Sequence, residues 1–517
     1  MSSIIDSVLA TVTSLKAAFQ TFVQLSKDYN TLLARVSQSP GVPSLPTTRS
    51  HWQKTVPDSA QLLHTSSTAL PEHADIVIIG SGITGTLVAR TILEHPNASG
   101  LKTVMIEARD VCSGATGRNG GHIKCDPHLI YHKHKAFRGR EAAEKATRLA
   151  MAHVDELIRI SEKVGGGERT EARRVETVDA YFDRALFARA CNKVKIFEEE
   201  MPVESKGITI LGAHEAQEKY GLSPICVGAI VSRAGAINPY KLVTALLTSF
   251  EEKYSDRFTI VSKCPASSII EPSTERPFYT LVTEKGNITA PHIVHATNAH
   301  VAHLVPALQS KVFPLRAVMT AQTHRSFPTT QAGERSFSFL YTEGFDYLTQ
   351  RPDGTIMFGG GFAQSPNQGM GEVGISTDDA YDPAAAAHLC GALSVLFKAP
   401  EHVESDTTNN VESIWSGSLG VSADWLPWVG RLPTRMAGRG APPSQKDSKI
   451  AQPGEWVSVG YSGEGMVNAP LCAKALAMMI LKPDEDNVSS WFPDEMRVSE
   501  RRCRKADPSG LLSDLWD

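Results

Sequence analysis

The chain has 517 residues and a formal net charge of −4, which gives enough length for two or more hydrophobic cores. The charge balance and a pI near 6.5 argue against a nucleic-acid partner held by bulk charge, and no apolar run is long enough to span a bilayer. The eight cysteines show no metal-binding spacing and the start shows no secretion signal, so we expect free thiols, no metal site and a cytoplasmic protein.

Residues 1 to about 36 are predicted to form one amphipathic helix. Further apolar residues beside its main stripe make the apolar face wider than a coiled-coil seam. Three interpretations stay open: docking on the protein's own body, homo-oligomerisation, or contact with a membrane surface, although the polar face is poor in Lys and Arg. The stripe occupies heptad a and d positions, with Ser26 as the one polar interruption: Ile5, Val8, Val12, Leu15, Phe19, Phe22, Tyr29, Leu33 and Val36.

Residues 37–70 are rich in Ser, Pro and Thr, and Pro40, Pro43 and Pro46 lie close together. Proline fixes the backbone and removes hydrogen-bond donors, so this stretch is predicted to be a linker or an extended arm over the surface.

The segment from Asp75 to Glu107 is predicted to form a strand, a glycine turn, a helix and a second strand. The turn reads Gly80-Ser-Gly-Ile-Thr-Gly85, a GxGxxG pattern, and the helix begins at Ile83. Such glycines allow a tight turn and close approach of a pyrophosphate to a helix N-terminus. Glu107 follows at the distance expected for a carboxylate that binds ribose hydroxyls. The order of these parts favours a dinucleotide site over an ordinary tight turn.

Three later stretches could also supply backbone to the nucleotide. The polar, glycine-dense stretch Ser113–His122 follows the crossover, and a mobile surface loop is the alternative interpretation. A strand over residues 293–298 ends in Ala296, Thr297 and Asn298. Residues 456–481 repeat a strand, a glycine turn and a helix, which suggests a second helix N-terminus aimed at the ligand.

Between these stretches, we expect a helix over residues 141–164, strands near 175–182 and 208–211, and a helix over 382–397. Residues 312–320, 337–341, 346–350 and 355–358 are predicted to form antiparallel strands. The polar and aromatic residues of these strands are the candidates for a substrate-facing surface: Arg316, Tyr341, Tyr347, Gln350 and Arg351. Of these, we take Tyr347, Arg316 and Gln350 as the candidate catalytic residues.

These stretches together resemble the D-amino-acid-oxidase-like flavoenzymes over roughly residues 71–480. The stretch Ser113-Gly-Ala-Thr-Gly-Arg-Asn-Gly-Gly121 looks most like the γ-glutamylputrescine oxidase branch, beside the glycine oxidase and sarcosine oxidase types. The resemblance implies an α/β protein with a discontinuous, GR2-type Rossmann-like FAD-binding domain and an α+β substrate domain on an antiparallel sheet. The expected cofactor-binding residues are Gly80, Ser81, Gly82, Ile83, Thr84, Gly85, Glu107, Ala108, Arg109, Ser113, Gly114, Ala115, Thr116, Arg118, Asn119, Gly120, Gly121, Ala296, Thr297, Asn298, Gly463, Glu464, Gly465 and Met466.

The expected domain order follows from the same resemblance. It comprises an N-terminal helix and linker (1–43), FAD-binding segments (44–135, 233–300 and 411–482), substrate-domain segments (136–232 and 301–410) and a C-terminal tail (483–517).

The resemblance implies oxidation of a C–N bond in a small amine or amino acid. Hydride passes to flavin N5, the imine hydrolyses, and O2 or an electron carrier takes the electrons. Two alternatives stay open: a hydroxylase or other flavin oxidoreductase that uses NAD(P)H, and a catalytically inactive FAD-binding scaffold.

Overall fold

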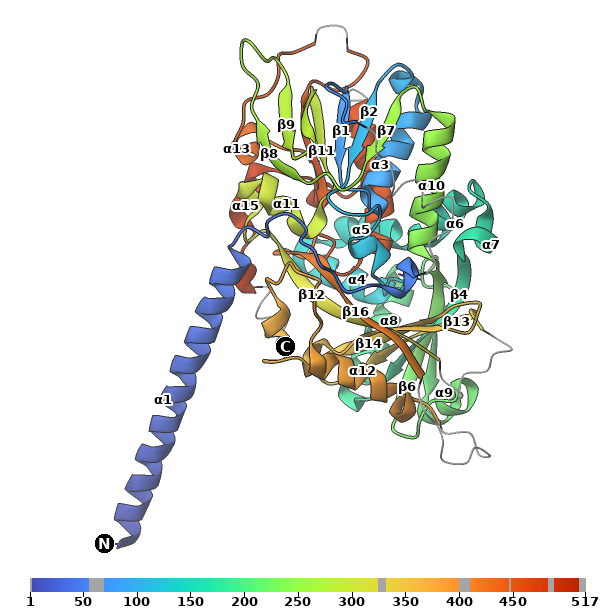
Figure 1. Cartoon of the computed structure of the whole chain (residues 1–517). Coiled ribbons are helices and arrows are strands. Elements are labelled where there is room, and N and C mark those ends of the chain that lie inside the picture. Colours follow the sequence, from blue (N-terminus) through green and yellow to red (C-terminus); the bar gives the residue numbers. More distant parts are fainter. Residues whose placement is uncertain are drawn as a thin grey trace.

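The structure, a computed structural model, describes residues 2–54, 69–323, 332–398, 410–445, 448–481 and 488–510. In these ranges the chain forms a body built on two large sheets, from which the first helix projects (Figure 1).

The first large sheet has six strands in the order β17-β18-β11-β1-β2-β7, in the upper half of Figure 1. All neighbouring pairs are parallel except β17 and β18. The predicted crossover is confirmed, because helix α3 (Ile83–Glu94) connects β1 to β2. The strands are β1 (Ile76–Ile79), β2 (Thr103–Ile106), β7 (Phe258–Val261), β11 (His292–His295), β17 (Trp428–Arg431) and β18 (Gly454–Val459).

Side-chain alternation along β1 explains how this sheet is covered on both faces. Ile76 and Ile78 pack in one core with α3, α10 (Pro239–Lys253) and α14 (Ala469–Leu481). Val77 and Ile79 point the other way, into a core shared with a small antiparallel sheet. A strand buried on both faces needs a continuous apolar run, which is what this one has. The small sheet consists of β8 (Ala266–Ile270), β9 (Tyr279–Thr283) and β10 (Gly286–Ala290).

The second large sheet has nine strands, in the order β16-β12-β15-β14-β13-β4-β6-β3 with β5 beside β6. The expected antiparallel sheet is therefore confirmed, with one parallel pair, β13 and β4. Strand β16 belongs to this sheet, although we expected residues 411 onward to join the FAD-binding domain. The strands are β3 (His122–Ile123), β4 (Arg173–Tyr181), β5 (Thr209–Gly212), β6 (Gly228–Ala236), β12 (Val312–Thr323), β13 (Arg335–Leu340), β14 (Phe345–Gln350), β15 (Ile356–Gly360) and β16 (Asn410–Ser422).

Helices α9 (Ala213–Tyr220) and α12 (Pro383–Leu396) cover one face of the nine-stranded sheet through an apolar core that includes Phe337, Phe339 and Phe358. The single helix expected over residues 141–164 is instead two helices, α5 (Arg140–Met151) and α6 (His153–Glu162), divided at Ala152. The remaining described helices are α4 (Pro127–Arg138), α7 (Gly166–Thr170), α8 (Arg184–Glu200), α11 (Val301–Leu304), α13 (Thr434–Ala437) and α15 (Glu500–Lys505).

Helix α1 (Ser2–Val36) confirms the predicted N-terminal helix, but only its last turns dock on the body. Leu32 and Val36 are buried in a core with β12 and α11, whereas Phe19 and Phe22 are 67% and 69% exposed. Figure 1 shows the rest of α1 extending away from the body. The interpretation of docking on the protein's own body therefore holds for the last turns of α1, and the stripe at Phe19 and Phe22 is left uncovered by the body. Among the described residues, no helix combines the length and apolar character needed to cross a bilayer.

Candidate functional site

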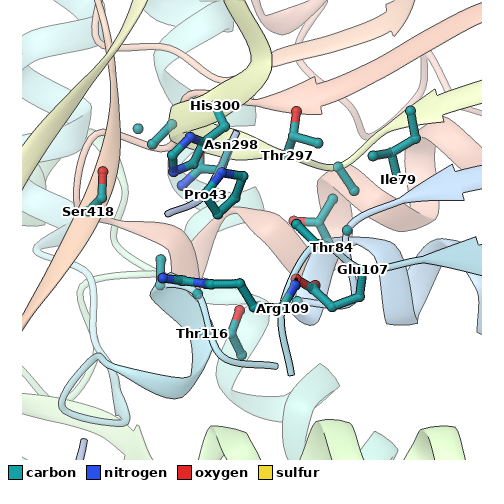
Figure 2. A pocket seen from close by; sticks show the side chains of 18 of the residues that line it. Pro43, Ile79, Thr84, Glu107, Arg109, Thr116, Thr297, Asn298, His300 and Ser418 are labelled. Carbon is teal, nitrogen blue, oxygen red and sulfur yellow. The ribbon is translucent and has the colours of Figure 1, made fainter. Parts of the chain in front are cut away.

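The main pocket lies where parallel strands of the six-stranded sheet end. Strand β1 leads into Gly80, β2 into Glu107, β11 into Ala296 and β18 into Gly460. Because these strands are parallel, their carboxyl ends meet at one edge. Open α/β sheets bind their ligands at this edge. Figure 2 shows Ile79, Glu107, Thr297 and Asn298 around this pocket.

The glycine turn packs too tightly for any larger residue at two positions. Gly80 has a φ of +107°, and a Cβ there would lie 2.7 Å from the carbonyl oxygen of Ala296. A Cβ on Gly85 would overlap the carbonyl oxygen of Gly80. The turn opens helix α3, whose N-cap, Gly82, has no side-chain cap. The turn therefore presents a helix N-terminus that suits a phosphate.

Glu107 is held in place by the same turn. Its Oε2 accepts hydrogen bonds from the backbone N and the hydroxyl of Ser81, at 3.0 and 2.6 Å, and its Oε1 accepts from the backbone N of Arg109 at 2.9 Å. The carboxylate thus lines the pocket from a fixed position, as a group that binds ribose hydroxyls must.

Two buried arginines flank the other side of the pocket. Arg109 binds both carboxylate oxygens of Asp378, at 2.8 and 3.1 Å, and Arg118 Nε lies 3.0 Å from Asp378 Oδ2. Burial lowers the pKa of Arg118 to about 10, against the opposite effect of Asp378, so it is charged at neutral pH. Two guanidinium groups therefore share the Asp378 carboxylate, and Glu107 adds a second carboxylate to the same pocket.

Most of the expected cofactor residues line this one pocket, and some only support it. Those that line it are Gly80, Gly82, Ile83, Thr84, Glu107, Ala108, Arg109, Gly114, Ala115, Thr116, Asn119, Ala296, Thr297, Asn298, Gly463, Gly465 and Met466. Those outside its lining are Ser81, Gly85, Ser113, Arg118, Gly120, Gly121 and Glu464.

Sequence reasoning missed a second group of lining residues: residues 41–43, His300, His303, Asp378, Ser418–Gly420 and Tyr461. Except for Tyr461, which follows β18 in the later glycine turn, these residues come from the linker, the short helices after β11, the segment before α12 and strand β16, and no glycine pattern marks them. Tyr461 lay inside an inspected stretch, so its place after β18 could have identified it.

Several buried polar atoms at the pocket have no partner among the described residues. They are Arg109 Nε, Thr297 Oγ1, His303 Nε2 and Ser418 Oγ, all from lining residues. A buried polar atom without a hydrogen bond is costly, so such atoms mark the place of a polar ligand. The residues present therefore fit a dinucleotide, with Glu107 at a ribose and the α3 N-terminus at the pyrophosphate.

Tyr347 lies on β14 of the nine-stranded sheet and approaches the glycine-dense stretch Ser113–His122, called the cofactor loop here. Its hydroxyl donates to Met319 Sδ at 2.9 Å and its ring stacks on His122, with 6.5 Å between centroids. A Cβ on Gly120 would lie 2.8 Å from the Tyr347 ring, so the glycine allows the two segments to meet. Burial raises the pKa of Tyr347 to about 12 and lowers that of His122 to about 3. Both side chains are neutral at pH 7.

A charged cluster follows His122 along the chain. Lys124 Nζ lies 2.6 Å from Asp126 Oδ1 and 2.7 Å from Asp179 Oδ1. Burial and the adjacent Asp126 raise the pKa of Asp179, so this carboxyl holds its proton more tightly than an exposed one. Burial, and then Asp126, also raise the pKa of Glu464, so the cluster reaches the turn that lines the pocket.

The other two candidate catalytic residues lie elsewhere. Arg316 Nε and Nη2 bind both oxygens of Glu372, at 2.6 and 3.2 Å, and Arg316 does not line the pocket. On β14, Tyr347 and Thr349 face the glycine-dense loop, where Thr349 donates to the Gly120 carbonyl. Gln350 points to the opposite face by strand alternation.

Tyr341 and Arg351 are also engaged within the protein. The Tyr341 hydroxyl donates to Asp346 at 2.8 Å, and Arg351 binds both oxygens of Glu171. The strand positions were predicted correctly, but the sequence contained no sign of these partners.

Three comparisons agree with this geometry. The chain is 23% identical over 428 residues to a probable oxidoreductase, OrdL, of Rhizobium meliloti, covering 79% of this chain and 83% of that protein. Its fold matches glycine oxidase of Geobacillus kaustophilus with a TM-score of 0.60 at 14% identity, covering 83% and 99% of the two chains. L-Proline dehydrogenase of P. horikoshii matches with a TM-score of 0.56 at 18% identity, covering 82% and 98%.

A family model described as "FAD dependent oxidoreductase" matches residues 75–479. This range contains both large sheets and the strand ends that form the pocket. The chain therefore belongs to the DAO family of FAD-dependent oxidoreductases.

Proposed function

We propose that this oxidoreductase oxidises a C–N bond of a small amine, with Tyr347, His122 and Met319 lining the substrate space. The observation that supports this proposal is the close approach of the Tyr347 ring to Gly120 in the cofactor loop. When bound, FAD supplies the acceptor for a hydride from the carbon beside the amine nitrogen. This proposal does not include Arg316 or Gln350. Arg316 is paired with Glu372, and Gln350 points to the face of the sheet opposite Tyr347.

The chain's own residues orient the amine and exclude water. Tyr347 and His122 are neutral at pH 7, so neither acts there as a strong acid or base. Aromatic walls of this kind hold a reacting carbon in position, which is a large part of catalysis when hydride transfer needs little proton movement. The substrate would react as the neutral amine, with solvent as the proton acceptor.

The charged groups near Tyr347 and His122 favour an amine over an amino acid. The arginines at the cofactor pocket and on the candidate substrate surface are all paired with acidic groups: Arg109, Arg118, Arg316 and Arg351. The nearest charged cluster contains Asp126 and Asp179 with a single Lys124. Because Lys124 is already paired with two carboxyl groups, this cluster offers no free cation to the carboxylate of an amino acid, whereas an amine needs none.

Anaerobic titration with an amine panel tests the proposal. The FAD-reconstituted protein should lose the absorbance of oxidised flavin with an amine and not with the corresponding amino acid. Rapid reoxidation by O2 would indicate an oxidase, and reoxidation only by an artificial carrier a dehydrogenase. Reduction by NADPH alone would support the hydroxylase alternative, and no reduction by any of these donors would support the scaffold alternative.

We also propose that the exposed stripe of α1 pairs with α1 of a second copy. An isolated helix is marginally stable in water, and Leu15, Phe19, Phe22 and Leu25 expose 50–69% of their surface. Phe19 and Phe22 of two copies, which are about two thirds exposed, could bury up to roughly 400–700 Å², a large part of the ~1,000 Å² that a specific interface needs. Lys16 is the only charged residue between positions 7 and 26, which gives little attraction to an anionic membrane.

Sedimentation of the full chain tests this pairing. F19E/F22E should shift a dimer to a monomer, while A17E/Q24E, which adds the same charges to the opposite face of the helix, should leave the dimer intact. A monomeric parent protein, or one that floats with lipid vesicles, would contradict the proposal.

Eight free cysteines support our proposal of a cytoplasmic location, which fractionation of the source cells would test.

A further inference from the structure

The segment that joins α1 to the body crosses the cofactor pocket. Residues 37–54, called the N-terminal arm here, lie outside the matched family region, which begins at residue 75. Gly41, Val42 and Pro43 nevertheless line the pocket, beside the ends of β1 and β2. Figure 2 shows Pro43 between His300 and Arg109, which come from opposite sides of the pocket.

Hydrogen bonds fasten the arm to both sides of the pocket. His300 Nδ1 donates to the Gly41 carbonyl at 3.0 Å, and Arg109 Nη1 donates to the Ser44 carbonyl at 3.4 Å. Just before this crossing, Ser376 Oγ donates to the Pro40 carbonyl at 3.0 Å. The crossing residues are therefore held at both ends by lining or neighbouring residues.

The arm is anchored again beyond the crossing. Thr48 donates through its backbone N and its hydroxyl to the Asp378 carbonyl, at 2.7 and 2.8 Å. Ser50 Oγ donates to the Gly117 carbonyl and Trp52 Nε1 to the Asn119 carbonyl, each at 2.6 Å. Trp52 is buried in the main core. These anchors reach the same glycine-dense loop that lines the pocket, so the arm and the loop support each other.

We infer that residues 41–44 of the arm are part of the FAD site and retain the cofactor. Four polar atoms of the pocket lining lack partners among the described residues, and the arm crosses beside one of the residues that carry them, Arg109. A ligand seated there would be covered by Val42 and Pro43, and a covered ligand leaves only after the arm opens. This inference depends on FAD binding alone and not on the proposed substrate.

Paired substitutions in the arm provide the test. V42D places a carboxylate in the pocket lining, where it repels the anionic pyrophosphate, and should raise the FAD dissociation constant at least about tenfold. L45D makes the same change three residues along, at a side chain that is 75% exposed and outside the lining, and should change it less than about twofold. Equal effects of V42D and L45D, or no effect of either, would overturn the inference.

Two truncations of the full-length protein extend the test. Removal of residues 2–44 should speed FAD release, followed by flavin fluorescence, whereas removal of residues 2–26 should not. Hydrogen exchange supplies a readout independent of variants: backbone amides at residues 41, 42, 44 and 45 should exchange more slowly with FAD bound than without it. Equal exchange in the two states would show that the arm does not contact the cofactor.

Discussion

The glycine turn Gly80–Gly85, called the cofactor cradle here, and the nine-stranded sheet are built on different kinds of contact. In the cradle, backbone geometry at Gly80 and Gly85 decides the shape, and no larger residue fits there. On the sheet, side chains such as Arg316 and Arg351 decide which surface is left for a substrate, and both are bound to carboxylates. A site made of backbone leaves a pattern of glycines in the sequence, whereas a site made of side chains leaves none.

The largest effect should come from filling the cradle. Gly85→Ala places a Cβ against the carbonyl oxygen of Gly80, both of which belong to rigid backbone, so the turn must open. We expect loss of FAD binding by about a hundredfold or more and destabilisation on the order of 2–4 kcal/mol. FAD titration and thermal unfolding of the apoprotein measure these two quantities.

Gly100→Ala is the matched control, because nothing lies within 4 Å of a Cβ built there. Wild-type affinity in Gly85→Ala would mean that the cradle tolerates side chains, and the distinction between the two regions would then be lost.

On the sheet, Tyr347→Phe and Arg316→Met should separate a substrate contact from a structural ion pair. Tyr347→Phe removes the hydroxyl that donates to Met319 in the proposed substrate space, and should lower kcat/KM about tenfold with little change in the free energy of unfolding. Arg316→Met leaves the buried Glu372 without its partner and should cost about 2–4 kcal/mol of stability with KM unchanged. Steady-state kinetics and chemical denaturation of both variants test this contrast, and the opposite pattern would restore Arg316 as a substrate residue.

The smallest effect concerns a pH-dependent pair on the far face of the sheet. A hydrogen bond to Asp346 raises the pKa of His388 above its ordinary value, against the effect of burial. A raised folded-state pKa stabilises the fold below the unfolded pKa, and this contribution disappears as the pH rises through the folded one. His388→Gln should therefore lower stability by less than about 1 kcal/mol at pH 6 and by less still at pH 8.

Denaturation at both pH values gives the comparison for His388→Gln, with FAD affinity as the internal control. A pH-independent loss would show that the histidine acts by packing alone.

The two regions also differ in how far the sequence predicted them. The β1-α3-β2 crossover, the acid at its end and the later glycine turn followed from local patterns, since parallel strands bring their ends together. The strands of the larger sheet were found by their alternation, but their partners were not. Pairing of Arg316 with Glu372 joins positions 56 residues apart, and that of Arg351 with Glu171 joins positions 180 apart. No local pattern encodes such a choice.

The arm shows the same limit from another direction. Its prolines predicted an extended segment, and nothing in its composition indicated that Val42 and Pro43 line the pocket. The burial of Trp52 and the hydrogen bond from His300 to Gly41 are both long-range contacts.

The order in which the pocket's parts leave the ribosome has a consequence for assembly. The arm is synthesised first, but the lining on which it rests includes Asp378 and Tyr461, from the last third of the chain. At about 5–20 residues per second, roughly 20 to 90 seconds pass between the synthesis of the arm and the synthesis of Tyr461. FAD must therefore bind late in the synthesis of the chain. A nascent chain that ends before β18 lacks part of the pocket lining that the arm covers in the complete fold.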